Sequence, residues 1–178
     1  MIYEIISSGF GGQGALTIGK FLAKAGMKEG KHVSWLPSYG PEMRGGTANV
    51  STVISDKPVA SPIVSFPNVL VALNQPSLDK FASSVVKGGF IIANENLCPK
   101  IPTFEGVKTI SAPLSKIATE IGSEMVLNML AIGMVIGLTD MIKYETIEAD
   151  LTAFLEKKNP KLLELNLIAI KKGIDLTK

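Results

Sequence analysis

Short apolar runs alternate with longer amphipathic segments over the first two thirds of the chain, and this pattern predicts an α/β fold. The run at 2–8 is rich in β-branched residues, and a strand-like run at 31–36 follows a helix-like segment that begins near Ala15 and ends at Gly30. A strand–helix–strand order is typical of a βαβ unit, so we expect parallel strands and a right-handed crossover. Further strands are predicted at 50–54, 69–73, 90–94 and 108–112.

The helical segments have their own periodicity. The first helix is expected to gather its apolar residues on one face and its lysines on another; these are Leu16, Phe21, Leu22 and Ala25, and Lys20, Lys24 and Lys28. A helix is predicted at 78–86, and four more at 115–121, 124–137, 144–156 and 160–172. The methionines of 124–137 favour a gap-filling core role, with a partner-facing surface as the alternative.

These elements predict one domain over 1–178. Residues 1–113 would form a mostly parallel, Rossmann-like sheet flanked by helices, and residues 114–178 a helical C-terminal cover. The longest apolar run, 125–138, is too short to span a bilayer, and no basic segment with a cleavage site opens the chain. We therefore expect a cytoplasmic protein without membrane contact.

Composition narrows the chemistry. The net charge is +2 and no basic block occurs, so nucleic acid is not an expected partner. Cys98 is the only cysteine and His32 the only histidine, so this chain alone can build neither a disulfide nor a zinc or iron–sulfur site.

A glycine-rich turn follows the first predicted strand, with the residues Gly9, Gly11, Gly12, Gln13 and Gly14. The spacing satisfies the dinucleotide fingerprint, and the amide groups that open the next helix favour an anion. The fingerprint also needs an acid at the end of the second strand, where Trp35-Leu36-Pro37 stands instead. Ordinary NAD binding is therefore disfavoured, which leaves a tight packing turn or a phosphate- or carboxylate-binding turn.

A second shaped loop follows the run at 31–36, and it contains the only arginine of the chain, Arg44. Its guanidinium can bind a carboxylate, a phosphate or carbonyl groups through two parallel hydrogen bonds, which lysine cannot do. Pairing with Glu42, or simple solvation, is the alternative. The candidate residues of this loop are Ser38, Tyr39, Gly40, Pro41, Glu42, Met43, Arg44, Gly45, Gly46, Thr47 and Asn49.

A third strand-end turn contains Asn74, Gln75 and Pro76, with Asn74 or Gln75 near a helix cap and Pro76 in the first turn. No catalytic set emerges from the sequence. His32 has no nearby acid and is expected to be a core or surface residue. Nothing near Cys98 would lower the pKa of its thiol, so we expect a packed or incidental cysteine.

Together these three motifs resemble the gamma subunit of the 2-oxoacid:ferredoxin oxidoreductases. The resemblance rests on 9–14, 37–49 and 74–81, with support from Glu164-Leu165-Asn166, and it covers essentially the whole chain. The loop at 39–46 is similar to that of the 2-oxoglutarate and branched-chain enzymes. Glu42-Met43 argues against the indolepyruvate branch, whose loop ends in Gln-Arg-Gly-Gly.

The resemblance implies a role inside a complex. The family decarboxylates a 2-oxoacid oxidatively on thiamine diphosphate with Mg, passes electrons through 4Fe–4S clusters to ferredoxin, and forms an acyl-CoA. Alpha and beta subunits, together with a delta or ferredoxin-like subunit, would hold these groups, and this chain would bind no cofactor alone. The expected 2-oxoacid is 2-oxoglutarate, then a branched-chain 2-oxoacid, then pyruvate.

We hypothesise that the glycine turns form a surface that docks the catalytic subunits, with Arg44 as a bidentate contact to a partner, CoA or substrate. Two alternatives stay open. The chain could be a purely structural assembly subunit, or a free-standing nucleotide-binding enzyme that uses the turn at 9–14.

Overall fold

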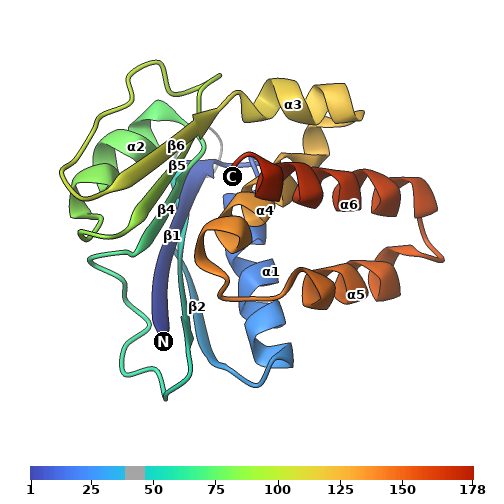
Figure 1. Cartoon of the computed structure of the whole chain (residues 1–178), viewed down its shortest axis with the longest axis horizontal. Helices are drawn as coiled ribbons and strands as arrows, with labels where there is room; N and C mark the ends of the chain where they lie inside the picture. The colour runs from blue at the N-terminus through green and yellow to red at the C-terminus, as the bar shows by residue number, and fades with distance from the viewer. Residues whose placement is uncertain (39–46) are drawn as a thin grey trace.

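The computed structural model describes residues 1–38 and 47–178, and within these ranges six strands form one sheet in the order β2-β3-β1-β4-β5-β6 (Figure 1). The strands are β1 (Ile2–Phe10), β2 (His32–Ser38), β3 (Thr47–Ser55), β4 (Val69–Ala72), β5 (Phe90–Asn94) and β6 (Lys108–Ala112). β1, β4, β5 and β6 pair in parallel, and the apolar side chains of the central strand β4 are all buried, as expected where both faces are covered.

The first βαβ unit differs from the prediction in one respect. β1 and β2 do not pair with each other, because β3 lies between them and is antiparallel to both. The pairing of β1 with β3 runs the full length of both strands, from Ile2 opposite Ser55 to Phe10 opposite Thr47. β3 also begins three residues before the predicted Val50, so that Thr47 and Asn49 belong to the sheet.

The helices are α1 (Ala15–Lys28), α2 (Gln75–Phe81), α3 (Leu114–Ile121), α4 (Leu127–Thr139), α5 (Tyr144–Leu155) and α6 (Pro160–Asp175), with 3₁₀ turns at Ala82–Ser84 and Glu124–Val126. The prediction of a helix over 78–86 was wrong at both ends. α2 begins three residues earlier, at Gln75, directly after the predicted cap residue Asn74, and the chain leaves the α conformation after Phe81. No helix of the described ranges is long and apolar enough to cross a membrane.

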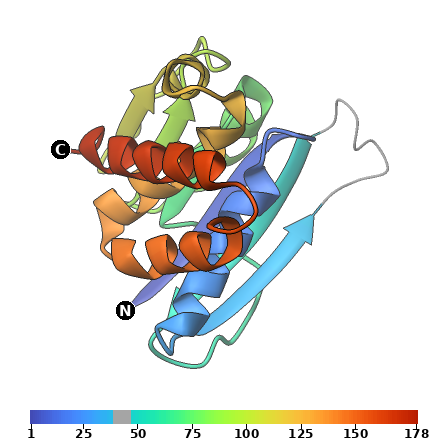
Figure 2. The same ribbon diagram turned by 90° about the vertical axis from the view of Figure 1, so that its right-hand side faces the viewer.

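The helices form unequal layers on the sheet. α2 covers one face, while α1 and α4 lie on the other (Figure 1). Outside this second layer, α5 packs on α1 and α6 packs on α4 (Figure 2). The C-terminal helices are therefore a cover over one side only, at the end of which α3 packs against α4 and α6.

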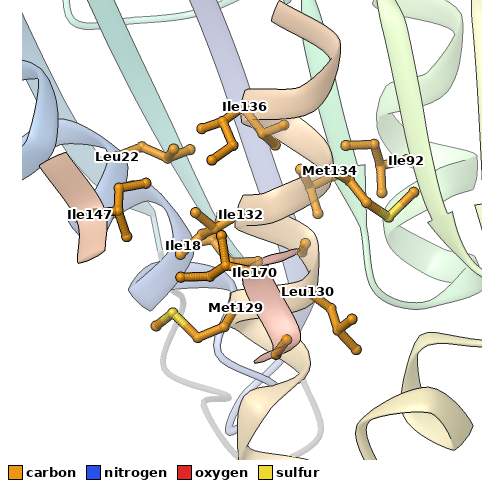
Figure 3. Close-up of a cluster of buried hydrophobic side chains, with 14 of the residues drawn as sticks. Ile18, Leu22, Ile92, Met129, Leu130, Ile132, Met134, Ile136, Ile147 and Ile170 are labelled. Atoms are coloured by element: carbon orange, nitrogen blue, oxygen red, sulfur yellow. The ribbon is translucent and has the colours of Figure 1, made fainter. Parts of the chain in front are cut away.

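α4 has no polar face because the sheet and α6 enclose it. Leu130, Ile132 and Met134 are fully buried, and Figure 3 shows their side chains spreading in different directions from the helix. Met129 and Met134 fill the core as predicted, whereas Met125, just before α4, is 73% exposed.

The buried face of α1 agrees with the prediction at Leu22 and Ala25 but not at Leu16 and Phe21. Ala15, Ile18, Leu22 and Ala25 are buried, at the spacing of about 3.6 residues per turn, whereas Leu16 and Phe21 are only partly buried. The lysines of α1 are exposed, as predicted.

Candidate functional site

The turns after β1 and β4 lie side by side, because these strands are parallel neighbours and end at the same edge of the sheet. The Leu73 amide donates to the Ser8 carbonyl at 2.9 Å and so extends the pairing into the turns. Since β3 is antiparallel, its start lies at this edge as well, with Asn49 opposite both Ser8 and Ser38. The edge that carries the two turns therefore also contains three of the predicted loop residues, Ser38, Thr47 and Asn49.

Gln13 connects the two turns through its side-chain amide. Its Oε1 accepts from the Phe10 backbone amide at 2.6 Å and from Asn74 Nδ2 at 3.2 Å. Its Nε2 donates to the Leu73 carbonyl at 3.5 Å. Gln13 therefore fixes the glycine turn to the end of the neighbouring strand β4. Its side-chain oxygen already accepts two hydrogen bonds and its nitrogen donates one.

Two glycines explain why the turn needs this sequence. A Cβ on Gly9 would lie 2.7 Å from Gln13 Oε1 and 3.0 Å from Leu73 Cβ, so a side chain there would separate the two turns. Gly14 precedes α1 with φ of 86°, a left-handed conformation that favours glycine. Gly9 is thus required for the close packing of the two turns, and Gly14 for the backbone conformation before α1.

The start of α1 presents donors without an acceptor inside the helix. The first intrahelical bond joins the Ile18 amide to the Gly14 carbonyl at 3.1 Å, so the amides of Ala15, Leu16 and Thr17 have no acceptor within α1. The first turn of α1 has no acidic residue. The backbone therefore suits a phosphate or carboxylate, as expected of the anion-binding alternative.

A cavity of about 520 Å³ adjoins this turn. Both polar and apolar side chains line it, including Thr17, Leu97, Ser115, Met125 and Asn128. Glu124 also lines the cavity, and its carboxylate would repel an anion bound there. A ligand there would need both amide-binding and apolar parts.

The turn after β4 is a helix cap. Asn74 Oδ1 accepts from the Ser77 backbone amide at 2.9 Å, and Pro76 lies in the first turn of α2, as predicted. The Ser8 hydroxyl donates to the Ser77 hydroxyl at 2.8 Å, and both are buried. Gln75 bonds both Asp79 and the Lys100 backbone. These side chains shape the edge and are not arranged to attack a substrate.

Among residues 1–38 and 47–178, no cluster of three or more His, Cys, Asp or Glu side chains is placed to hold a metal ion. His32 is exposed at the start of β2, away from the glycine turn. Cys98 is buried, and burial raises the pKa of its thiol to about 11, which keeps it protonated at neutral pH. A single buried thiol does not fit a 4Fe–4S cluster, which needs several thiolates.

The centre of the second loop lies outside the described residues. This applies to Tyr39, Gly40, Pro41, Glu42, Met43, Arg44, Gly45 and Gly46, and hence to any pairing of Arg44 with Glu42.

Sequence reasoning missed Asn128 as part of the site. It lies at the start of α4 against the glycine turn, since a Cβ on Gly14 would be 3.2 Å from Asn128 Cβ. Its buried Oδ1 has no hydrogen-bond partner within the part of the chain that is described. The sequence does contain a feature that could have identified Asn128, because it is the one polar residue within the longest apolar run, 125–138.

The profile of the pyruvate ferredoxin/flavodoxin oxidoreductase family matches residues 4–176. The chain belongs to this family. The predicted resemblance is thereby confirmed, and the α/β fold agrees with a solved gamma subunit of a keto/oxoacid ferredoxin oxidoreductase from Geobacter sulfurreducens PCA. That structure has a TM-score of 0.83 and 30% identity, and the alignment covers 98% of both chains.

Two curated relatives differ in length. The ketoisovalerate oxidoreductase subunit VorA of Methanothermobacter thermautotrophicus is 42% identical over 94% of this chain, which spans only 35% of that relative. The 2-oxoglutarate synthase subunit KorC of Methanocaldococcus jannaschii is 35% identical over 98% of this chain and 94% of its own length.

A longer solved chain contains the same fold. The 2-oxoglutarate:ferredoxin oxidoreductase of Magnetococcus marinus, solved with 2-oxoglutarate, coenzyme A and succinyl-CoA bound, has a TM-score of 0.88 and 26% identity. The alignment covers 99% of this chain and 31% of that one. Members of the family thus occur as short chains and as parts of longer ones.

Proposed function

We propose that this chain is the gamma-type subunit of a 2-oxoacid:ferredoxin oxidoreductase. The observation that carries the proposal is the family match over 4–176, supported by the 30% identity to a solved gamma subunit of a keto/oxoacid ferredoxin oxidoreductase. The chain has a single cysteine, and residues 1–38 and 47–178 hold no cluster of metal-binding side chains. Alpha, beta and delta-type subunits would hold thiamine diphosphate, Mg and the 4Fe–4S clusters. Ferredoxin would be the external acceptor, and the location would be cytoplasmic.

Within such a complex, the edge formed by the glycine turn, Asn74 and the ends of β2 and β3 would face the catalytic subunits. Gln13 and Asn74 give this edge a fixed shape, because they are hydrogen-bonded to each other and to the backbone. The free amides at the start of α1 favour a carboxylate or phosphate there, either from a partner side chain or from CoA. Arg44 would supply a bidentate contact at the same edge.

We propose 2-oxoglutarate as the substrate of the complex, because the loop sequence at 39–46 is similar to that of the 2-oxoglutarate enzymes and the 2-oxoglutarate synthase subunit KorC is 35% identical to this chain. Ketoisovalerate is the second candidate, because the VorA relative has the higher identity. Purified complex should be assayed with 2-oxoglutarate, ketoisovalerate and pyruvate at equal concentrations with CoA and ferredoxin. The ratio of kcat/KM between these substrates identifies the preferred one.

Reconstitution tests the subunit role. The chain should form no acyl-CoA alone, should co-purify with thiamine- and cluster-binding subunits from its host, and should raise their turnover on addition. Acyl-CoA formation by the isolated chain would contradict the proposal. Micromolar binding of NAD, FAD or ATP by the isolated chain would instead favour a free-standing nucleotide-binding enzyme.

A further inference from the structure

A second concave surface lies outside the glycine-turn edge, between α1 and α5. We call it the basic–aromatic groove. Its cavity has a volume of about 260 Å³ and is lined by Thr17, Lys20, Phe21, Lys24, Asp150 and Phe154. Figure 2 shows α5 lying across α1, and the two helices are in contact.

The groove combines an exposed aromatic ring with excess positive charge. Phe154 is 58% exposed, and Lys158 Nζ lies 4.3 Å from the centre of its ring. Among the described residues, Asp150 is the one acid that lines the cavity, and Lys24 and Lys28 both pair with it. Lys20 is exposed and forms no ion pair within residues 1–38 and 47–178, so the groove keeps a net positive charge.

The groove is continuous with the glycine-turn edge. Thr17 lines the basic–aromatic groove and also lines the cavity beside Gly12 and Gly14. A partner that covers the glycine turn therefore reaches this groove by continuing along the outer side of α1. Aromatic side chains, phenylalanine included, are enriched at protein interfaces, and an exposed apolar patch rimmed by polar residues often marks one.

We propose that the groove binds an acidic segment of the catalytic subunit that covers the glycine turn, with an apolar side chain of that segment against Phe21 and Phe154. This proposal rests on the proposed function. Carboxylates on the segment would pair with Lys20 and Lys158, because these charges are not neutralised in the described chain. A second copy of this chain does not fit, since a two-fold contact would bring the same lysines against each other.

The test uses the assembled complex and a zero-length carbodiimide, which joins a lysine only to a carboxylate in direct contact. We expect cross-links from Lys20 or Lys158 to Asp or Glu residues within one contiguous segment of a catalytic subunit. Lys20→Glu and Phe154→Ala should each weaken assembly about tenfold or more. Lys57→Glu is the matched control, because Lys57 is exposed at the opposite edge of the sheet, and it should assemble normally.

The outcomes separate this inference from the subunit role. If the wild-type chain joins no catalytic subunit, both proposals fail. If it joins but Lys20 and Lys158 stay open to amine labelling in the complex, or the Lys20→Glu variant assembles like Lys57→Glu, only the groove proposal fails. Cross-links to ferredoxin or to a second copy of this chain would equally overturn it.

Discussion

Gln13 shows how one side chain can determine the geometry of a whole edge. Its carbonyl oxygen accepts from Phe10 in its own turn and from Asn74 in the next one. We expect Gln13→Ala to lower the free energy of unfolding by about 1–2 kcal/mol, because it leaves the partly buried Phe10 amide without its acceptor. Urea unfolding measures the change, and Thr103→Ala at an exposed position is the control. An unchanged midpoint would contradict the connecting role.

Gly9 provides a sharper test of the same contact. A Cβ there meets Gln13 Oε1 at 2.7 Å, so Gly9→Ala should destabilise the chain by about 1–3 kcal/mol. In the Gln13→Ala background this cost should be smaller, because the nearest clash is gone and only the contact with Leu73 remains. A double-mutant cycle from urea unfolding measures the coupling, and strict additivity would show that the two residues act independently.

At the scale of elements, α1 and α5 are joined by a buried carboxylate. Burial alone would raise the pKa of Asp150, but hydrogen bonds from Lys28 and Lys24 outweigh it and lower the pKa below its usual 3.8. Both lysines are about half exposed, so Asp150→Asn should cost roughly 1–3 kcal/mol at pH 7, less than a fully buried pair.

The pH dependence of this contribution has a definite sign. The folded-state pKa of Asp150 is lowered, so its contribution is complete above pH 3.8 and is lost as the pH falls below that value through the folded pKa. The difference in unfolding free energy between wild type and Asp150→Asn should therefore be constant from pH 7 to pH 5 and shrink below pH 4. A difference that grows on acidification would contradict the lowered pKa.

Glycine residues allow the backbones of α4 and α6 to pack closely against each other. A Cβ on Gly133 would lie 2.1 Å from the Ile170 carbonyl oxygen, and backbone cannot move aside as a side chain can. Gly133→Ala should therefore cost about 3 kcal/mol, even though alanine favours helices. Gly137→Ala is the milder comparison, since its nearest contact is the side-chain hydroxyl of Thr177 at 2.6 Å and its nearest backbone contact, Ile174 Cα, is 3.2 Å away. Thermal unfolding should rank Gly133→Ala as the less stable variant.

At the scale of the whole molecule, local patterns predicted most elements but not their order in the sheet. The strands at 90–94 and 108–112 match the prediction residue for residue, because apolar runs between turn residues define them locally. The insertion of β3 between β1 and β2 depends on pairing between distant residues, which periodicity does not encode. For the same reason, only part of the candidate site could be predicted from the sequence. Residues 9–14 and Asn74 were predictable as strand-end turns, whereas Asn128 reaches them only through the packing of α4.

Arg44 belongs to this largest scale, because its proposed role exists only in the complex. Lysine keeps the charge but loses the planar, bidentate geometry, so Arg44→Lys should weaken assembly with the catalytic subunits about tenfold while the kcat of the assembled fraction stays normal. Titrating the variant against the catalytic subunits and following acyl-CoA formation separates the two quantities. Normal assembly with reduced kcat would assign Arg44 to CoA or substrate instead of a partner. Normal values of both would show that the single arginine has no special role, and the docking hypothesis would then depend on the glycine turn alone.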